Sequence, residues 1–309
     1  MGPFSYPVFT APLFEVSRAY DVSTHMYADD TQLYLSFRPC ELHQNVPKLN
    51  QCLEAIRAWM IDNHLKLNES KTEFLIIGNK AVLKKLDGIP QINIGSETII
   101  PNASAKNIGV VFDSNMSMAE HVRSVTRACY HQLHKIGQIR PFLTEEAAAS
   151  LVRSLVLSKL DYSNSLLYGL PDSLIDKLQL VQNSATKLVM RKKKSDHVTP
   201  LLKHLHWLPV RLRIIFKIYL LTFKAVHHLA PAYLCELVQP YQPVRSLRSS
   251  SLNLLTEKCS KLKWSGDRAF SICGPKLWNE LPESIRTCQS LDIFKTSVKT
   301  YLFRQYFSE

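Results

Sequence analysis

The 309 residues suit two or three domains, and 46% hydrophobic with 21% charged residues is an ordinary composition for a globular protein with a hydrophobic core. The 9 glycines and 16 prolines favour helices broken by turns over a sheet-rich sandwich. The net charge of +12 is uneven, because residues 1–115 hold 10 Lys and Arg against 12 Asp and Glu, whereas residues 116–309 hold 28 against 14.

The cysteines and the apolar stretches argue against secreted and membrane proteins. Seven scattered cysteines form no CxxC pair and have no zinc-finger spacing, which indicates free thiols in a reducing compartment. The most apolar stretch, residues 214–225, contains Lys217 and Lys224 and is too short to span a bilayer. No signal peptide is evident. We therefore expect an intracellular protein of the cytoplasm or nucleus with no membrane partner.

The first predicted element is a β-hairpin over residues 24–37, THMYADDTQLYLSF. Two β-rich arms flank a tight centre at Ala28-Asp29-Asp30, and apolar residues alternate with period two in the second arm. The hairpin is therefore expected to present acidic residues at its tip.

A helix and further β elements follow the hairpin. Apolar residues at three-to-four spacing predict a helix from about Val46 to Asn63, with Pro47 in its first turn. The later β elements expected here are a buried strand stopped by Gly78, a hairpin turned at Gly95-Ser96 and one more strand, at residues 74–77, 92–100 and 108–112.

After residue 115 the pattern becomes helical. Ser117 and Glu120 have the spacing of a capping box, and Thr144 is placed to cap the next helix. Further helices are expected after Pro171 and Pro209 and over residues 293–306. The stripe predicted for the helix after Pro171 is Leu174, Leu178, Val181, Ala185 and Leu188. A linker and a turn are expected at residues 244–251 and 264–266.

The adjacent carboxylates Asp29 and Asp30 carry the clearest chemical signal. Two neighbouring carboxylates repel each other and are costly to bury unless cations neutralise them. In two-metal phosphoryl transfer, carboxylates hold two divalent cations about 4 Å apart, and a hairpin projects such side chains from a rigid base. A bare pair of aspartates is more commonly a solvated turn, so the assignment depends on the surrounding sequence.

That surrounding sequence resembles the palm of LINE-type (non-LTR) retrotransposon reverse transcriptases. Tyr-Ala-Asp-Asp between apolar arms is followed by a helix and by residues 67–73, LNESKTE, as in that family. Residues 106–113, KNIGVVFD, are similar to the family's next segment, around the primer grip. Segments that look like its nucleotide-pocket tail, thumb-side helices and C-terminal region are residues 1–3 and 12–13, then 160–162, 168–171 and 178–183, then 268–270 and 275–282.

The resemblance implies an RNA-directed DNA polymerase, a nucleotidyltransferase that uses Mg²⁺, with Mn²⁺ as the substitute. It implies that Asp29 is the metal ligand of the hairpin, that Asp30 is a weaker partner and that Tyr27 packs beside the primer end. Lys71 matches the family's lysine proposed to protonate the leaving pyrophosphate. The alternative for Lys71 is a solvated lysine at a strand edge.

One departure from the family pattern matters for activity. The family's palm takes another metal-binding aspartate from a strand well upstream of the hairpin. Only 28 residues precede Asp29, and their acidic residues, Glu15 and Asp21, do not lie in an apolar strand resembling that motif. The fingers and most of the nucleotide pocket are also expected to be missing. We therefore expect half a site, with weakly bound metal and no DNA synthesis by this chain alone.

A basic run forms the second candidate site. Arg191, Lys192, Lys193 and Lys194, with Lys187 one turn earlier, lie at the end of a predicted helix. They either stabilise the negative end of the helix dipole or bind phosphate groups with salt-dependent affinity. The sequence leaves both interpretations open.

Three histidines near that run are a weaker signal. His197, His204 and His206 could hold a metal ion, but Asp196 alone adds a carboxylate and no cysteine completes the set. Ordinary core or surface histidines are the favoured interpretation.

The sequence thus predicts an α+β fold. An incomplete reverse-transcriptase palm is expected over residues 1–115, a helical thumb over 116–230 and a small C-terminal module over 231–309. The expected function is that of a reverse-transcriptase fragment acting on RNA and DNA through the primer–template backbone. The alternative is a non-catalytic nucleic-acid-binding protein derived from such an element. The oligomeric state is left open.

Overall fold

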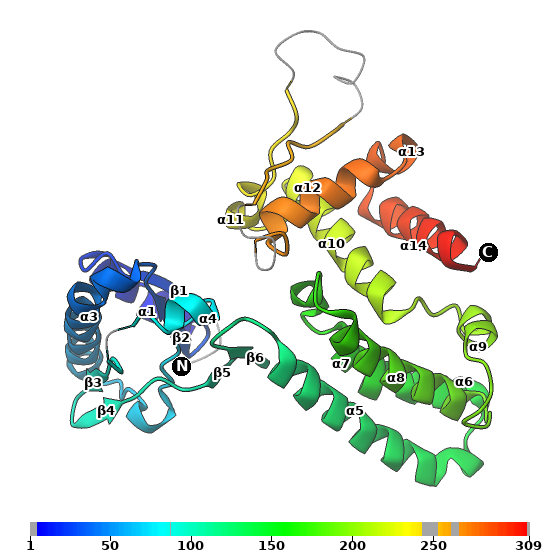
Figure 1. Ribbon diagram of the computed structural model, residues 1–309, viewed down its shortest axis with the longest axis horizontal. Helices are drawn as coiled ribbons and strands as arrows, with labels where there is room; N and C mark the ends of the chain where they lie inside the picture. The colour runs from blue at the N-terminus through cyan, green and yellow to red at the C-terminus, as the bar shows by residue number, and fades with distance from the viewer. Residues whose placement is uncertain (1–4, 87, 243–252, 261–265, 308–309) are drawn as a thin grey trace. The chain divides into compact units, whose positions relative to one another are not determined.

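The computed structural model describes residues 5–86, 88–242, 253–260 and 266–307. The chain divides into two compact units, Met1–Glu120 and His121–Glu309 (Figure 1). The first unit mixes helices with short strands and the second is helical in its described part, so the predicted α+β class is confirmed. Across the described ranges, no helix is both long enough and apolar enough to cross a membrane. The predicted linker at 244–251 lies outside these ranges, as does most of the predicted turn at 264–266.

The first unit combines β-hairpins with one long helix. Its elements are α1 (Ser5–Thr10), α2 (Leu13–Arg18), β1 (Ser23–Tyr27), β2 (Asp30–Tyr34), η1 (Pro39–Glu41), α3 (Leu42–Asp62), η2 (Glu69–Lys71), α4 (Lys80–Leu83), β3 (Ile92–Ile94), β4 (Glu97–Ile99), β5 (Ser104–Asn107) and β6 (Val110–Asp113). The strands pair as β1–β2, β3–β4 and β5–β6, and each antiparallel pair is a separate two-stranded sheet.

Two predicted hairpins are confirmed and two strand predictions need correction. Residues 74–77 are not a strand. The segment and its next residue make only isolated backbone bonds to their neighbours, in which Asn102 N donates to Phe74 O and Gly78 N donates to Ser114 O. The strand predicted at 108–112 is instead the second arm of the β5–β6 hairpin. Its first residues, Ile108 and Gly109, form the turn with positive φ.

The core of the first unit lies between α2, α3 and the β1–β2 hairpin. Burial of apolar surface on one face of each element provides the driving force for this packing. Its buried members are Leu13, Val22, Cys52, Ile56 and Met60, and Met26, Leu33 and Leu35 of the first hairpin pack against them.

Helix α3 begins earlier than its pattern predicted. It starts at Leu42 instead of near Val46, so Pro47 lies inside the helix and not in its first turn. The turn η1 precedes the helix, and Glu41 Oε2 accepts a hydrogen bond from Arg38 N at 2.8 Å. The chain is therefore already in a helical turn when α3 begins.

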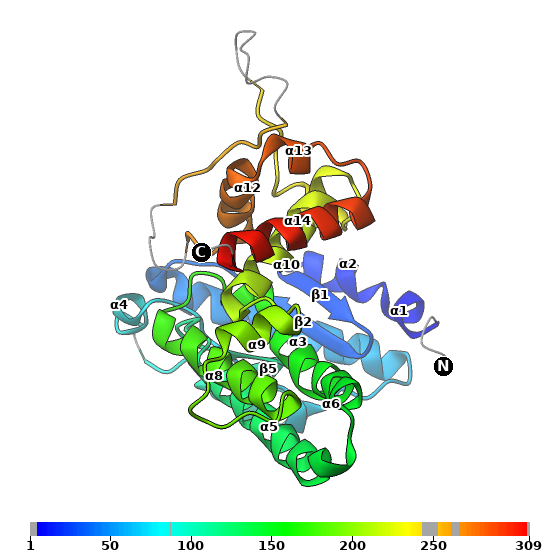
Figure 2. The same cartoon turned by 90° about the vertical axis from the view of Figure 1, so that its right-hand side faces the viewer.

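The second unit is a set of packed helices. Its elements are α5 (Ala119–Ile139), which starts at the unit boundary, η3 (Arg140–Phe142), α6 (Glu145–Val152), the π-helical turn η4 (Arg153–Leu157), α7 (Ser158–Asp161), η5 (Asn164–Leu167), α8 (Asp172–Val189), α9 (Thr199–His204), α10 (Val210–Val226), α11 (Ala232–Cys235), α12 (Phe270–Glu280), α13 (Glu283–Arg286) and α14 (Leu291–Phe307). Helices α5, α6 and α8 lie side by side in both views (Figure 1, Figure 2).

The predicted helix signals of this unit are confirmed at several positions. Thr144 Oγ1 caps α6 by accepting from Ala147 N at 3.2 Å, and Pro171 precedes α8. The buried stripe of α8 is rotated from the predicted one, because α6 and α10 cover neighbouring parts of the helix surface. Ile175 and Val189 are buried, while Leu174 and Leu188 are only partly buried.

Helix α10 packs against both α12 and α14 in the later part of this unit. The fully buried ring of Phe223 stacks on Phe294 with ring centroids 4.3 Å apart, and Phe294 in turn contacts Trp278 at 5.7 Å. Helices α12 and α14, which belong to the C-terminal module predicted over residues 231–309, therefore share a core with α10.

The segment around Tyr168 and the segment that begins at Arg268 contact each other. Arg268 donates from Nε to Tyr168 O at 3.1 Å and from Nη2 to Leu166 O at 3.2 Å. Gly169 adopts a φ of +68°, and a Cβ at this position would lie 2.8 Å from Arg268 Cγ. A glycine is required here because the arginine side chain occupies the space of any side chain.

Residues 275–282, PKLWNELP, hold a neighbouring stretch of chain in place through hydrogen bonds. Asn279 pairs with the backbone of Leu255 through both of its amide atoms, at 2.9 Å each. Trp278 Nε1 donates to Asn253 O at 2.8 Å. The residues of the PKLWNELP segment therefore attach the stretch around Leu255 to α12.

Candidate functional site

The β1–β2 hairpin presents its two aspartates at an exposed tip. Tyr27 pairs with Asp30 in the ladder, so Ala28 and Asp29 form a two-residue turn. Ala28 has a φ of +55°, whereas the φ of Asp29 is negative. A positive φ at the first turn residue alone is the pattern of a type II′ turn. Glycine is the usual residue at the first position of such a turn, so alanine holds the turn in a strained conformation.

The strands of the hairpin pack against the rest of the first unit, whereas the residues at its tip are exposed to solvent. Met26 and Leu33 pack on the core of the first unit, and Gln32 Oε1 accepts from Asn107 Nδ2 at 2.8 Å. By contrast, Asp29 and Asp30 are exposed, and Tyr27 is 63% exposed. The hairpin therefore positions two carboxylates and an aromatic ring toward solvent on a rigid base.

The carboxylates around the hairpin do not fit a two-metal centre. Among the described residues, no group of three or more His, Cys, Asp or Glu side chains could hold a metal ion. Asp21 is paired with Lys48 at 2.9 Å, and Glu15 is paired with Arg18 at 3.7 Å. Two carboxylates supply only part of the six oxygen ligands that Mg²⁺ takes, so water would have to supply the rest.

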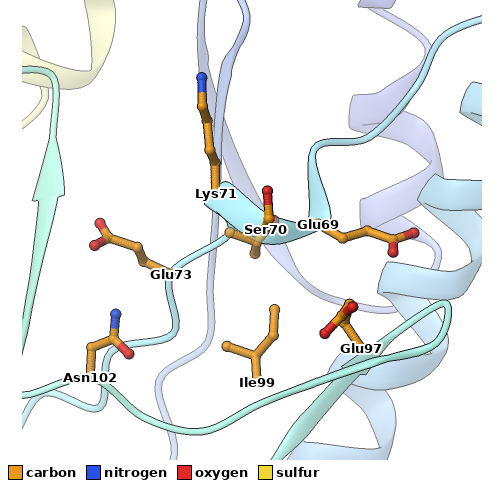
Figure 3. A pocket seen from close by; sticks show the side chains of 8 residues that line it. Glu69, Ser70, Lys71, Glu73, Glu97, Ile99 and Asn102 are labelled. Carbon is orange, nitrogen blue, oxygen red and sulfur yellow. The ribbon is translucent and has the colours of Figure 1, made fainter.

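Lys71 lies in a separate acidic hollow at η2. The hollow has a volume of about 590 Å³ and is lined by Glu69, Ser70, Lys71, Thr72, Glu73, Glu97, Ile99 and Asn102 (Figure 3). The Lys71 side chain is exposed and extends away from the three glutamates (Figure 3). Within the described part of the chain, no hydrogen bond or ion pair connects Lys71 with Asp29 or Asp30.

Two of the glutamates in this hollow have partners in the fold. Glu73 Oε2 accepts from Lys106 N at 2.8 Å, and Glu69 Oε1 lies 3.4 Å from Arg57 Nε. Gly95, with a φ of +59°, leaves room for that ion pair, because a Cβ there would lie 2.7 Å from Glu69 Oε1. Glu69 therefore connects η2 to α3, and Glu73 connects the segment after η2 to the β5–β6 hairpin.

The basic run begins at the C-terminal end of α8, where Arg191 closes the helix. Arg191 has a φ of +49°, and Lys192 N and Arg191 N donate to the carbonyl oxygens of Lys187 and Leu188, as in a Schellman motif. One Nη of Arg191 donates to the backbone oxygens of Arg140, Pro141 and Leu143 at 3.1–3.2 Å. This geometry supports the helix-end interpretation for Arg191.

Arg140 provides the reciprocal contact from the other helix end. Its side chain is only 6% exposed and donates from Nε to Leu188 O at 2.9 Å and from Nη2 to Val189 O at 2.6 Å. Burial lowers the pKa of the Arg140 guanidinium, and the charge of Arg191 lowers it further. An arginine nevertheless stays protonated at neutral pH, so the cation remains at this position.

The lysines of the run are less constrained. Lys187 Nζ donates to Lys194 O, and Lys193 N donates to Asp196 Oδ2 at 2.8 Å. The side chains of Lys192, Lys193 and Lys194 are exposed and have no hydrogen-bond or ion-pair partner in the part of the chain that the structure describes. They are therefore accessible to an anionic ligand.

Sequence reasoning missed Arg140 and the role of Asp113. Asp113 is 9% exposed, and its carboxylate accepts from Ser117 N at 2.9 Å and from Met118 N at 2.7 Å. Ser117 Oγ in turn accepts from Ala119 N at 3.3 Å at the start of α5. The signal was present, since an aspartate after an apolar strand and before a helix is a good capping residue.

One curated relative is similar to this chain. Over 201 residues, 25% are identical to a Drosophila melanogaster protein described as "Probable RNA-directed DNA polymerase from transposon BS". The match covers 61% of this chain and 21% of that protein, so the chain spans about a fifth of its relative's length. No family model and no solved structure match the chain. The similarity supports a protein related to a retrotransposon reverse transcriptase.

Proposed function

We propose that the chain is the later part of a reverse transcriptase from a LINE-type (non-LTR) retrotransposon. The exposed Asp29-Asp30 pair at the tip of a rigid hairpin carries the proposal. A two-stranded hairpin anchored on a core is what RNA-directed DNA polymerase chemistry needs to hold carboxylates toward a primer end. The similarity to a transposon polymerase supports the same origin. In this proposal, residues 1–115, 116–230 and 231–309 are late palm, thumb and C-terminal region.

The residues of the proposed site have three roles. Asp29 and Asp30 supply oxygen ligands for Mg²⁺, or for Mn²⁺ in its place, and Tyr27 packs beside the primer end. Lys71 protonates the pyrophosphate leaving group in the complete polymerase. Because the described carboxylates do not complete a two-metal set, residues 1–309 alone bind metal loosely and do not extend a primer.

Non-catalytic nucleic-acid binding is the second candidate function, and the basic run favours it. Lys187 and Arg191 close a helix end, whereas Lys192, Lys193 and Lys194 extend to solvent. A cluster of accessible lysines supplies sequence-independent affinity for the phosphates of RNA and DNA. Nucleic-acid binding of this kind does not require a complete metal site, so a chain that cannot polymerise DNA would retain it.

Both candidates are tested with one purified protein and one substrate. A labelled DNA primer annealed to an RNA template is incubated with residues 1–309, and binding is measured by fluorescence anisotropy over a salt series. Extension is measured with Mg²⁺ and deoxynucleotides. We expect binding that weakens steeply with salt and no extension. Robust extension that Asp29→Asn abolishes would contradict the incomplete site, and absence of binding at low salt would contradict both candidates.

A further inference from the structure

A cationic hollow lies where the C-terminal ends of α5 and α8 meet. It has a volume of about 400 Å³ and is lined by Gly137, Arg140, Pro141, Lys187, Leu188, Arg191 and Lys192. Four of these residues are cationic, and none is acidic. The hydrogen bonds between Arg140, Arg191 and the backbone of the opposite helix end fix the hollow in shape.

The helix ends account for only part of this positive charge. Each helix C-terminus carries about half a negative charge, so the two ends together offset about one cation. Glu145 is close enough to influence the pKa of Arg140, but its Oε1 lies 3.3 Å from His204 Nε2. Asp196 faces the backbone N of Lys193. With Lys193 and Lys194, which follow Lys192 in sequence, the four cations of the hollow make six. Even if both carboxylates are counted in full, they and the helix ends offset only about three of these six charges.

An exposed aromatic residue directly follows Pro141, which lines the hollow. Phe142 is 87% exposed, the highest value among the large hydrophobic side chains that the structure describes as exposed. It belongs to η3, and Arg191 binds the backbone oxygens of Pro141 and Leu143 on either side of it. A phenylalanine held in water on a fixed backbone gives up the free energy of burial, about 1.5–3 kcal/mol. Its place on the backbone next to a residue of a hollow rich in cations indicates a ligand with both a phosphate and a flat apolar face.

We propose that this surface binds single-stranded nucleic acid, with a backbone phosphate in the cationic hollow and an unpaired base stacked on Phe142. The inference rests on the proposed function, because it identifies which form of nucleic acid the basic end recognises. Unpaired bases expose their flat faces to aromatic side chains, whereas bases in a duplex are stacked on each other. The hollow supplies the phosphate contact and the ring supplies the preference for a single strand.

The test compares four anionic ligands that differ in whether they offer unpaired bases, no bases, paired bases or a lipid surface. Anisotropy is measured for residues 1–309 with a 20-nucleotide oligo(dT), the same backbone without bases, a 20-base-pair duplex, and vesicles containing phosphatidylserine. We expect the oligo(dT) to bind more tightly than its abasic counterpart. Phe142→Ala should weaken oligo(dT) binding about five- to 150-fold, the effect of removing one stacking aromatic. It should leave abasic binding unchanged.

Matched variants separate the ring from the charge. Phe142→Trp should keep the preference for bases, while Phe142→Leu should lose it although the residue remains apolar. Lys187→Gln with Lys192→Gln should weaken both single-stranded ligands and lower the salt slope by about 0.7 for each phosphate that the protein no longer neutralises. Lys177→Gln and Leu180→Ala, exposed positions earlier on α8, are the controls and should change neither property.

The possible outcomes distinguish this inference from the proposed function. Nucleic-acid binding that is insensitive to the Phe142 and lysine variants would overturn the hollow as the site and leave the proposed function standing. Equal affinity for the abasic strand, or tighter binding of the duplex, would overturn the stacking on Phe142. Tight binding of vesicles through Phe142 without binding of oligo(dT) would assign the surface to a membrane. Absence of binding to every nucleic acid would overturn both proposals.

Discussion

Arg140 and Arg191 carry like charges, yet each donates hydrogen bonds to the backbone carbonyl groups at the helix end next to the other residue. The Arg140 guanidinium binds the last carbonyl groups of α8, immediately before Arg191, and an Nη of Arg191 donates to Arg140 O at 3.2 Å. The carbonyl oxygens between the two guanidinium groups offset their mutual repulsion, because each arginine is surrounded by the negative end of a helix dipole.

Replacing Arg140 with methionine should lower the free energy of unfolding by about 3 kcal/mol. The buried carbonyl group of Val189 would lose its charge-assisted partner, and that of Leu188 would keep only the 3.4 Å bond from Arg191 N. Unsatisfied buried acceptors are costly. Urea unfolding followed by circular dichroism measures the effect. Arg211→Met is the control, since its ion pair with Asp172 is solvent-exposed and such pairs contribute about 1 kcal/mol or less. Equal shifts in both variants would contradict the role of Arg140.

Replacing Ala28 with glycine should stabilise the first unit by up to about 1 kcal/mol. The φ of +55° at Ala28 is costly for alanine and free for glycine, which outweighs the greater flexibility of glycine in the unfolded chain. Thermal unfolding measures the change. Ala58→Gly, at an exposed position inside α3, should have the opposite sign, because glycine is unfavourable in a helix. Destabilisation by both substitutions would show that the hairpin turn is not strained.

Replacing Gly169 with alanine should destabilise the second unit by about 3 kcal/mol. The new Cβ would meet Arg268 Cγ at 2.8 Å, and the hydrogen bonds of that arginine prevent it from moving away freely. Gly88→Ala is the matched substitution, because Gly88 also has a positive φ but no atom lies within 4 Å of its added Cβ. It should cost only about 1 kcal/mol. If calorimetry gave the same cost for both, the contact with Arg268 would be unimportant.

Calorimetric titration with Mn²⁺ should detect at most one loose site at the hairpin tip. Two exposed carboxylates leave most ligand positions to water, so the dissociation constant should lie well above the micromolar range. Asp29→Ala should remove the signal, and Asp62→Ala, near the end of α3, should not. A sub-micromolar site that depends on Asp29 would contradict the incomplete carboxylate set.

Stability should fall as the pH decreases below neutrality. His121 is 3% exposed, and burial lowers the pKa of its imidazole below the usual value of 6.5. The unfolded chain therefore takes up a proton at a higher pH than the folded chain does. The stability that neutral His121 contributes is complete above pH 6.5 and is lost as the pH falls toward the folded pKa. Urea midpoints at pH 7.5 and 5.5 should differ less for His121→Gln than for the unaltered chain. An identical difference would exclude His121 as the cause.

The sequence determined those features that depend on neighbouring residues. Alternation of apolar residues predicted the β1–β2 hairpin, and a proline or threonine at the right position predicted the starts of α6 and α8. These predictions succeeded because a strand or a helix presents one face to the core, and its period is written in the local order of residues. The uneven charge was likewise visible in the composition alone.

The tertiary structure decided everything that joins distant parts of the chain. Residues 74–77 have the composition of a strand, yet they form none, because pairing requires a partner strand that local sequence does not specify. The local sequence does not mark Arg140 as a structural residue, and only the fold brings it to Leu188, 48 residues later. The fold also leaves Phe142, the residue after Pro141 of the cationic hollow, in solvent. The free energy of such contacts depends on which surfaces remain after packing, and that is a property of the whole fold.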